Sequence, residues 1–202
     1  MKLIVVTSPT YFVEEDKIIT ALFEEGLDIL HLRKPDTLPI YAERLLTLIP
    51  KKFHCRIVLH DYFYLKKEFS LKGIHLNSRN PKEPTDYSGH ISCSCHSIEE
   101  VKDKKQLYDY VFMSPIYDSL TKENYDSAYT PEVLRKAQKE RIIDSNVIAL
   151  GGICAENMIE VKDFGFGGAA ILGDLWNRFD VCTDRDYRGV IEHFKKLQEL
   201  AD

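Results

Sequence analysis

The stretch Asn146-Val147-Ile148-Ala149-Leu150-Gly151-Gly152 is a short apolar run that stops at a pair of glycines. Its apolar residues follow one another without alternation, which is typical of a strand in a sheet that is covered on both faces. Runs of the same kind recur along the chain, and the sequence predicts strands at 3–7, 28–33, 56–60, 72–76, 90–95, 109–113, 146–150 and 168–172.

The segments between these runs carry helical signals. Ser97 stands three residues before Glu100, which is the pattern of a capping box at the start of a helix. Thr130 followed by Pro131 predicts a second helix start, with the helix continuing to about Glu140. Strands therefore alternate with helices, and this order predicts parallel strands that are joined by right-handed crossovers.

The number of these units decides between two α/β architectures. Eight units in 202 residues predict one (β/α)₈ TIM barrel that spans residues 1–202 as a single domain. The alternative is an open, doubly wound sheet, which commonly carries a Gly-x-Gly-x-x-Gly motif after its first strand. No such motif follows residues 3–7, so the sequence favours the barrel.

Composition excludes several classes of protein. Apolar residues make up 44% of the chain and charged residues 29%, as in ordinary globular proteins. The formal net charge of -5 gives no indication of nucleic-acid binding. No apolar run approaches the ~20 residues of a membrane span, and the first run is too short for the core of a signal peptide. We therefore expect a cytoplasmic protein with no membrane partner.

The five cysteines are scattered, which suits a reducing compartment. Cys93 and Cys95 lie two residues apart in an expected strand, so they share one side of it, while Ser94 and His96 share the other. A zinc site needs further ligands at suitable spacing, and no second Cys/His pair is evident. The sequence favours two packed thiols.

In a barrel of this kind, functional groups lie at the carboxyl ends of the strands. The loops after the seventh and eighth strands are the usual phosphate site, because backbone N–H groups there approach an anion. The candidates are Gly151, Gly152, Leu172 and Gly173. The alternative for Gly151 and Gly152 is a tight turn without a ligand. We expect Gly152→Val to block the anion before it disturbs the fold.

Other strand ends supply charged and titratable side chains. His96 is a candidate acid–base group, because imidazole titrates near neutral pH, and a structural histidine is the alternative. Arg33 and Lys122 are either substrate-binding cations or solvated surface charges. His31 and Arg33 share one side of their strand, and Ser94 shares a side with His96. Three further histidines end strands, and we expect at least two of them to be structural. They are His31, His60 and His75.

Several motifs resemble the thiamine phosphate synthase/TenI family. They occur in the family's order, and the resemblance runs from Ile4 to about Trp176. The motifs are Gly73-Ile74-His75-Leu76, Asp109-Tyr110-Val111, Ser114-Pro115-Ile116-Tyr117, Thr121-Lys122 and Val147-Ile148-Ala149-Leu150-Gly151-Gly152-Ile153. The resemblance implies a (β/α)₈ barrel and a role in thiamin biosynthesis.

The synthase branch of the family joins a pyrimidine pyrophosphate to a thiazole phosphate and uses Mg²⁺. The resemblance implies that Arg33 and Lys122 bind the pyrophosphate. Hydroxyls for the thiazole phosphate fall at Ser119 and Thr121, the phosphate loops at Gly152 and Gly173, and one magnesium aspartate at Asp61.

The chain departs from the synthase pattern at several of these positions. His31-Leu32-Arg33-Lys34-Pro35 stands where synthases usually have Gln-x-Arg-Glu-Lys, and His60-Asp61 where they have Asn-Asp. The second magnesium carboxylate falls on the neutral Asn80, and Gly173 replaces a serine. Because Mg²⁺ is usually held by carboxylates together with substrate phosphates, the change at Asn80 weakens a magnesium site, although pyrophosphate could still carry the metal in.

The TenI branch is similar to a thiazole tautomerase, which aromatises a thiazole carboxylate phosphate without a cofactor. His31-x-Arg33 and Ser94-x-His96-Ser97 favour this branch, and His96 matches the family's acid–base histidine in position. We therefore expect a tautomerase, with the synthase as the alternative. A non-catalytic regulator that binds thiazole or thiamin phosphate is a third hypothesis. A homo-oligomer is compatible with the sequence.

Overall fold

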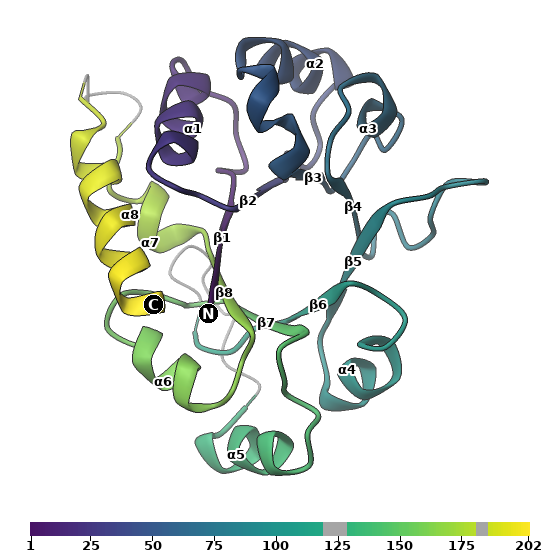
Figure 1. Ribbon diagram of the computed structural model, residues 1–202, viewed down its shortest axis with the longest axis vertical. Coiled ribbons are helices and arrows are strands. Elements are labelled where there is room, and N and C mark those ends of the chain that lie inside the picture. The colour runs from purple at the N-terminus through teal and green to yellow at the C-terminus, as the bar shows by residue number, and fades with distance from the viewer. Residues whose placement is uncertain (119–128, 181–185) are drawn as a thin grey trace.

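The computed structural model describes residues 1–118, 129–180 and 186–202. Its parallel strands form a closed barrel in which each strand pairs with the next along the chain and β8 pairs with β1 (Figure 1). The strands are β1 (Lys2–Val6), β2 (Ile29–Leu32), β3 (Ile57–Leu59), β4 (Gly73–Leu76), β5 (His90–Cys95), β6 (Tyr110–Met113), β7 (Val147–Leu150) and β8 (Gly168–Ile171). The predicted (β/α)₈ barrel is confirmed, and each predicted strand end lies within one residue of the observed end.

Helices surround the ring of strands on its outside (Figure 1). They are α1 (Glu15–Glu24), α2 (Pro39–Leu48), the 3₁₀ helix η1 (Lys51–Arg56), α3 (Leu65–Glu68), α4 (Ile98–Lys104), α5 (Pro131–Lys139), α6 (Met158–Asp163), α7 (Gly173–Trp176) and α8 (Arg188–Ala201). Both predicted helix starts are confirmed. The Ser97 hydroxyl accepts a hydrogen bond from the Glu100 N–H at 3.1 Å, and Thr130 caps α5 in the same way.

None of the helices in the described residues has the length and apolar character that a bilayer crossing requires.

The strands separate two shells of buried residues. The outer shell packs between barrel and helices and includes Cys93 and Cys95, so the prediction of two packed thiols is confirmed. The inner shell fills the barrel and consists of Ile4, Val6, Ile29, Val58, Tyr110, Phe112, Ile148 and Ala170. The interior also holds the buried polar side chains of His31, His75 and Ser92, so it is less apolar than is usual for this fold.

A buried ion pair ties the end of β2 to α1. The Lys34 ammonium donates to a Glu15 carboxylate oxygen at 2.5 Å and to the Thr10 carbonyl at 2.8 Å. The two charged side chains are 3% and 1% exposed. Burial raises the pKa of Glu15 to about 7 although Lys34 acts to lower it. Lys34 is therefore a structural cation that faces α1, whereas the neighbouring Arg33 lines the mouth of the barrel.

We predict that Glu15→Gln lowers the free energy of unfolding by about 3 kcal/mol at pH 8, because the buried Lys34 ammonium loses its counter-charge. Urea denaturation measures this change. The matched control is Glu14→Gln, which breaks the solvent-exposed pair between Glu14 and Lys17 and is expected to leave stability unchanged. Equal effects of the two substitutions would contradict the interpretation of the buried pair.

Candidate functional site

A cavity of about 390 Å³ opens at the carboxyl end of the barrel. This volume lies in the range of small-molecule sites. Each strand end contributes to the lining, in chain order through Val6, Arg33, His60, Asn77, His96, Ser114, Gly151 and Leu172. The cavity therefore lies where functional groups gather in this fold.

The structure brings most of the predicted site residues together. The cavity is lined by Arg33, Ser94, His96, Gly151, Gly152, Leu172 and Gly173. His31 differs, because its side chain is completely buried within the barrel. Asp61 lies at the rim, paired with Arg79. Ser119, Thr121 and Lys122 fall outside the described residues, so their roles stay predictions.

Backbone packing at the seventh strand end requires glycine. Gly151 and Gly152 have φ angles of +98° and +62°, a region that L side chains rarely adopt. A Cβ atom on Gly152 would lie 2.2 Å from the Asp118 carbonyl oxygen. The expectation that Gly152→Val acts on an anion before it disturbs the fold is therefore wrong, since the substitution collides with the chain itself.

The eighth strand end leads directly into α7, whose first residue is Gly173. No hydrogen bond to another described residue engages the backbone N–H of Gly152 or of Gly173. Both residues line the cavity, so these N–H groups are available to a bound anion. The predicted phosphate site at the seventh and eighth strand ends stays a proposal.

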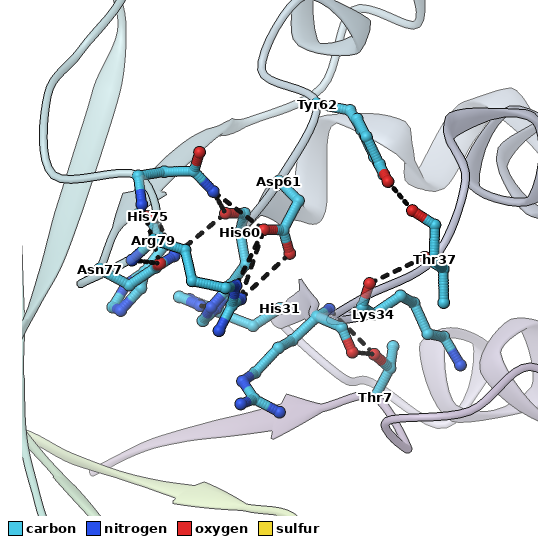
Figure 2. Close-up of polar contacts among 12 residues, drawn as sticks. Thr7, His31, Lys34, Thr37, His60, Asp61, Tyr62, His75, Asn77 and Arg79 are labelled. Atoms are coloured by element: carbon cyan, nitrogen blue, oxygen red, sulfur yellow. Dashed lines mark hydrogen bonds and ion pairs between the residues drawn. The ribbon is translucent and has the colours of Figure 1, made fainter.

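Two guanidinium groups stand at the opposite part of the rim. Arg79 donates to both oxygens of Asp61, at 3.3 Å for each Nη2 contact and 3.4 Å for Nε (Figure 2). The Arg33 guanidinium makes no hydrogen bond to any residue that the structure describes. Burial is the main cause that lowers the pKa of Arg33, and the positive charge of Arg79 lowers it further.

The position expected for a magnesium site holds a different arrangement. The Asn80 amide donates to Asp61 Oδ1 at 2.9 Å and to the His60 carbonyl at 2.9 Å. Asp61 therefore accepts from an amide and a guanidinium at once, and the neutral Asn80 stands where the resemblance places the second magnesium carboxylate. These residues do not fit a magnesium site built from two carboxylates.

Three histidines form a buried hydrogen-bonded network below the cavity. His31 is bonded through Nδ1 to His60 Nε2 at 2.9 Å and through Nε2 to the Tyr110 hydroxyl at 2.7 Å. His75 is bonded to the hydroxyls of Ser92 and Ser94, at 2.8 and 2.9 Å. His31 and His75 are thus internal residues with both ring nitrogens engaged, as expected for at least two of the three.

Burial keeps this network neutral. It lowers the pKa of His31 and His60 well below the usual 6.5 and that of His75 to about 3. One nitrogen of each ring lies within 4.8 Å of one nitrogen of each other ring, which is close enough for three ligands of a single metal ion. However, the His60 and His75 rings stack with centroids 4.2 Å apart and planes 22° apart. Their in-plane lone pairs therefore do not converge on one ion.

His96 has the surroundings of a proton-transfer group. It is exposed, and its Nδ1 lies 3.1 Å from the Ser114 carbonyl oxygen. Since a carbonyl oxygen only accepts, Nδ1 carries the proton in the neutral ring and Nε2 holds the free lone pair. Its place beside Ser94 on the cavity agrees with the strand alternation used in the sequence analysis.

Arg79 is the main site residue to which sequence reasoning gave no role. It follows β4 in the stretch Asn77-Ser78-Arg79-Asn80, a strand end like the others. Its side chain becomes informative only through the contact with Asp61, which lies 18 residues earlier in the chain. A cation at a strand end was the available signal.

A closed (β/α)₈ barrel with a small-molecule cavity at the strand ends defines the class of (β/α)₈-barrel enzymes. Within this class, the family model described as thiamine monophosphate synthase matches residues 3–175. The chain belongs to this family, and it is an enzyme of thiamin biosynthesis. The resemblance found in the sequence is confirmed.

Individual relatives agree with this assignment. The crystal structure of a thiamine phosphate pyrophosphorylase from Bacteroides thetaiotaomicron is 70% identical, covers 100% of this chain and 98% of its own, and superposes with a TM-score of 0.94. The thiamine-phosphate synthase of Halalkalibacterium halodurans is 25% identical over 91% of this chain and 90% of its own length. A thiamine phosphate pyrophosphorylase from Pyrococcus furiosus, at 20% identity and a TM-score of 0.73, shows the shared fold.

We predict that acid destabilises the protein through the buried histidines. A histidine with a lowered pKa binds protons more readily when unfolded, so stability falls as the pH drops below about 6.5. For His75 this loss continues towards its folded pKa of about 3. His75→Asn removes one such group, so the unfolding free energy of this variant should fall less steeply with decreasing pH, by at most ~1.4 kcal/mol per pH unit.

Urea denaturation at several pH values between 5 and 7 measures the slope. Ser92→Ala is the control, because it removes a hydrogen-bond partner of the same ring but no titrating group. It should keep the wild-type slope. A His75→Asn slope equal to that of the wild type would show that His75 is not kept neutral by burial.

Proposed function

We propose that this enzyme is a thiamine-phosphate synthase, which joins a pyrimidine pyrophosphate to a thiazole phosphate and releases pyrophosphate. The names of its relatives support the synthase over the tautomerase that the sequence favoured, foremost that of the Bacteroides protein, which is 70% identical over the whole chain. The observation that carries the proposal is the placement of two groups of potential anion-binding donors on one cavity. Arg33 and Arg79 stand at the β2 and β4 ends, and the glycine loops lie across the ring at the β7 and β8 ends.

This arrangement suits a reaction between two phosphorylated substrates. The thiazole phosphate would bind the N–H groups of Gly152 and Gly173, which have no partner among the described residues, and this would leave the thiazole nitrogen towards the centre of the cavity. The bond between the pyrimidine methylene carbon and the pyrophosphate oxygen breaks, and its electron pair leaves with the pyrophosphate. Arg33 and Arg79 would stabilise the charge that develops there. The thiazole nitrogen then supplies the electron pair of the new carbon–nitrogen bond.

Mg²⁺ was the cofactor expected for a synthase, with Asp61 as one ligand. Because the described residues do not fit a two-carboxylate site, the proposal assigns no step to the metal. Ser119, Thr121 and Lys122 are proposed to add hydroxyls and a second cation to the anion subsites. The cytoplasmic location and the homo-oligomer stay predictions.

A thiazole tautomerase is the second candidate, and the geometry of His96 favours it. Its Nδ1 is held by the Ser114 carbonyl, so Nε2 can remove a proton from a ligand in the cavity and return it elsewhere. This reaction requires no metal and no pyrophosphate, and Arg33 would bind the substrate carboxylate. The enzyme relatives give no support to the third hypothesis, a non-catalytic regulator.

One assay separates the two reactions. Purified protein receives either thiazole phosphate or the thiazole carboxylate phosphate tautomer, with and without pyrimidine pyrophosphate, and in Mg²⁺ or EDTA. Thiamin phosphate that forms from thiazole phosphate and pyrimidine pyrophosphate supports the synthase. Aromatised thiazole that forms from the thiazole alone, at a rate insensitive to EDTA, would replace it with the tautomerase.

Arg33→Lys is expected to lower kcat/KM by ~5–150-fold, because lysine keeps the charge but loses the paired N–H donors that bind an anion side by side. Steady-state kinetics with the active substrate set measures this effect. An unchanged kcat/KM would return Arg33 to the class of solvated surface charges.

His96→Ala gives a prediction that differs between the two candidates. If the enzyme is a synthase, its kcat falls less than about tenfold, since departure of pyrophosphate drives the reaction. In a tautomerase the loss of the proton shuttle costs ~10²–10⁴ in kcat, with little change in phosphate binding. Wild-type isomerisation by His96→Ala would eliminate His96 as the proton shuttle.

A further inference from the structure

We propose that Arg79, anchored by Asp61, completes with Arg33 a diphosphate-binding site that needs no divalent cation. Asp61 is then a positioning residue for Arg79 and not a metal ligand. The inference deepens the proposed synthase function, and it rests on that function for the identity of the ligand as a pyrophosphate group.

The Arg33 guanidinium is a cation that forms no ion pair with any residue that the structure describes. It lies partly buried at the cavity, where burial and the nearby Arg79 lower its pKa while Asp61 and Asp36 act to raise it. Within residues 1–118, 129–180 and 186–202 it has no hydrogen-bond acceptor. Asp61 balances the charge of Arg79, so Arg33 is the group at this part of the cavity that an anionic ligand would pair with.

Arg79 is fixed in place by its neighbours. Its backbone N–H donates to Asn77 Oδ1 at 2.9 Å, and its guanidinium donates through Nε and Nη2 to Asp61. Nη1 makes no hydrogen bond to a described residue and remains for a ligand. The Asp61 and Arg79 side chains are 18% and 35% exposed, so the pair lies against the cavity wall with its free edge in solvent.

The positive charge of Arg79 balances the negative charge of Asp61. A magnesium ion between two carboxylates is neutral as a unit, and so is the guanidinium–carboxylate pair of Arg79 and Asp61. With the neutral Asn80 at hydrogen-bond distance from Asp61, the present arrangement offers a diphosphate the same overall charge without a metal. His60 below is also neutral, because burial lowers its pKa. Arg33 then supplies the net positive charge of the subsite.

Calorimetric titration with inorganic pyrophosphate tests the proposal on the full chain. We expect binding in EDTA, with a Kd within about threefold of that in Mg²⁺. Arg79→Ala should weaken binding by ~10–100-fold in both solutions, the usual effect of losing a hydrogen bond between charged groups. The matched control is Arg188→Ala, which removes the exposed pair of Arg188 with Asp186 on α8 and should leave binding unchanged.

Asp61→Asn separates the positioning role from metal ligation. The substitution loosens Arg79 and removes one negative charge, and neither effect depends on a metal, so the proposal expects pyrophosphate binding to change by the same factor with and without Mg²⁺. A metal ligand would instead show its loss in Mg²⁺ alone. A thermal melt of each variant confirms that it is folded, and Arg79→Lys provides a variant that keeps the charge.

Pyrophosphate binding that requires Mg²⁺, or that Arg79→Ala leaves unchanged, would overturn the inference. The same holds if pyrophosphate binds in neither solution. The synthase assay is read separately: product that forms with a strict need for Mg²⁺ keeps the proposed function and rejects the metal-free site. Metal-free pyrophosphate binding through Arg79 without any thiamin phosphate product keeps the site and rejects the function.

Discussion

Closure of the sheet is the constraint on which the rest of the molecule depends. The pairing of β1 with β8 runs from Lys2 opposite Gly168 to Val5 opposite Ile171, and it joins the two ends of the sheet. Because all strands are parallel, closure places every carboxyl end on one rim. Trp176 strengthens the same seam by donating its indole N–H to the Val6 carbonyl at 2.7 Å. A cavity assembled from eight separate strand ends follows directly from this geometry.

Different chemical groups occupy different parts of the rim of the cavity. Guanidinium groups occupy the β2 and β4 ends, backbone N–H groups the β7 and β8 ends, and His96 stands after β5 between them. Anionic groups bound at these two parts of the rim would be held apart across the cavity, with the atoms between them towards the imidazole. Both candidate reactions could use this division: the synthase for the phosphate and the pyrophosphate of its two substrates, and the tautomerase for the phosphate and the carboxylate of one.

The fold could be predicted from sequence because most strands are buried on both faces and so appear as short, largely apolar runs, although β5 alternates polar and apolar residues. The same rule located Arg33, His96 and the glycine loops, since a strand end is visible in sequence. Contacts between elements could not be found in this way. In the sequence, Lys34 and its neighbour Arg33 are both cations at a strand end. Only the packing of α1 shows that the Lys34 side chain forms an ion pair with Glu15.

The network beneath the cavity has a consequence for ligand recognition. Each neutral imidazole carries one N–H, so the chain from Tyr110 through His31 to His60 can run in either direction. When Tyr110 donates to His31, the proton of His60 resides on Nδ1, which has no partner among the described residues. When the chain reverses, Nδ1 becomes an acceptor. The floor of the cavity can thus present either hydrogen-bonding character to a substrate by a shift of tautomers, with every heavy atom in place.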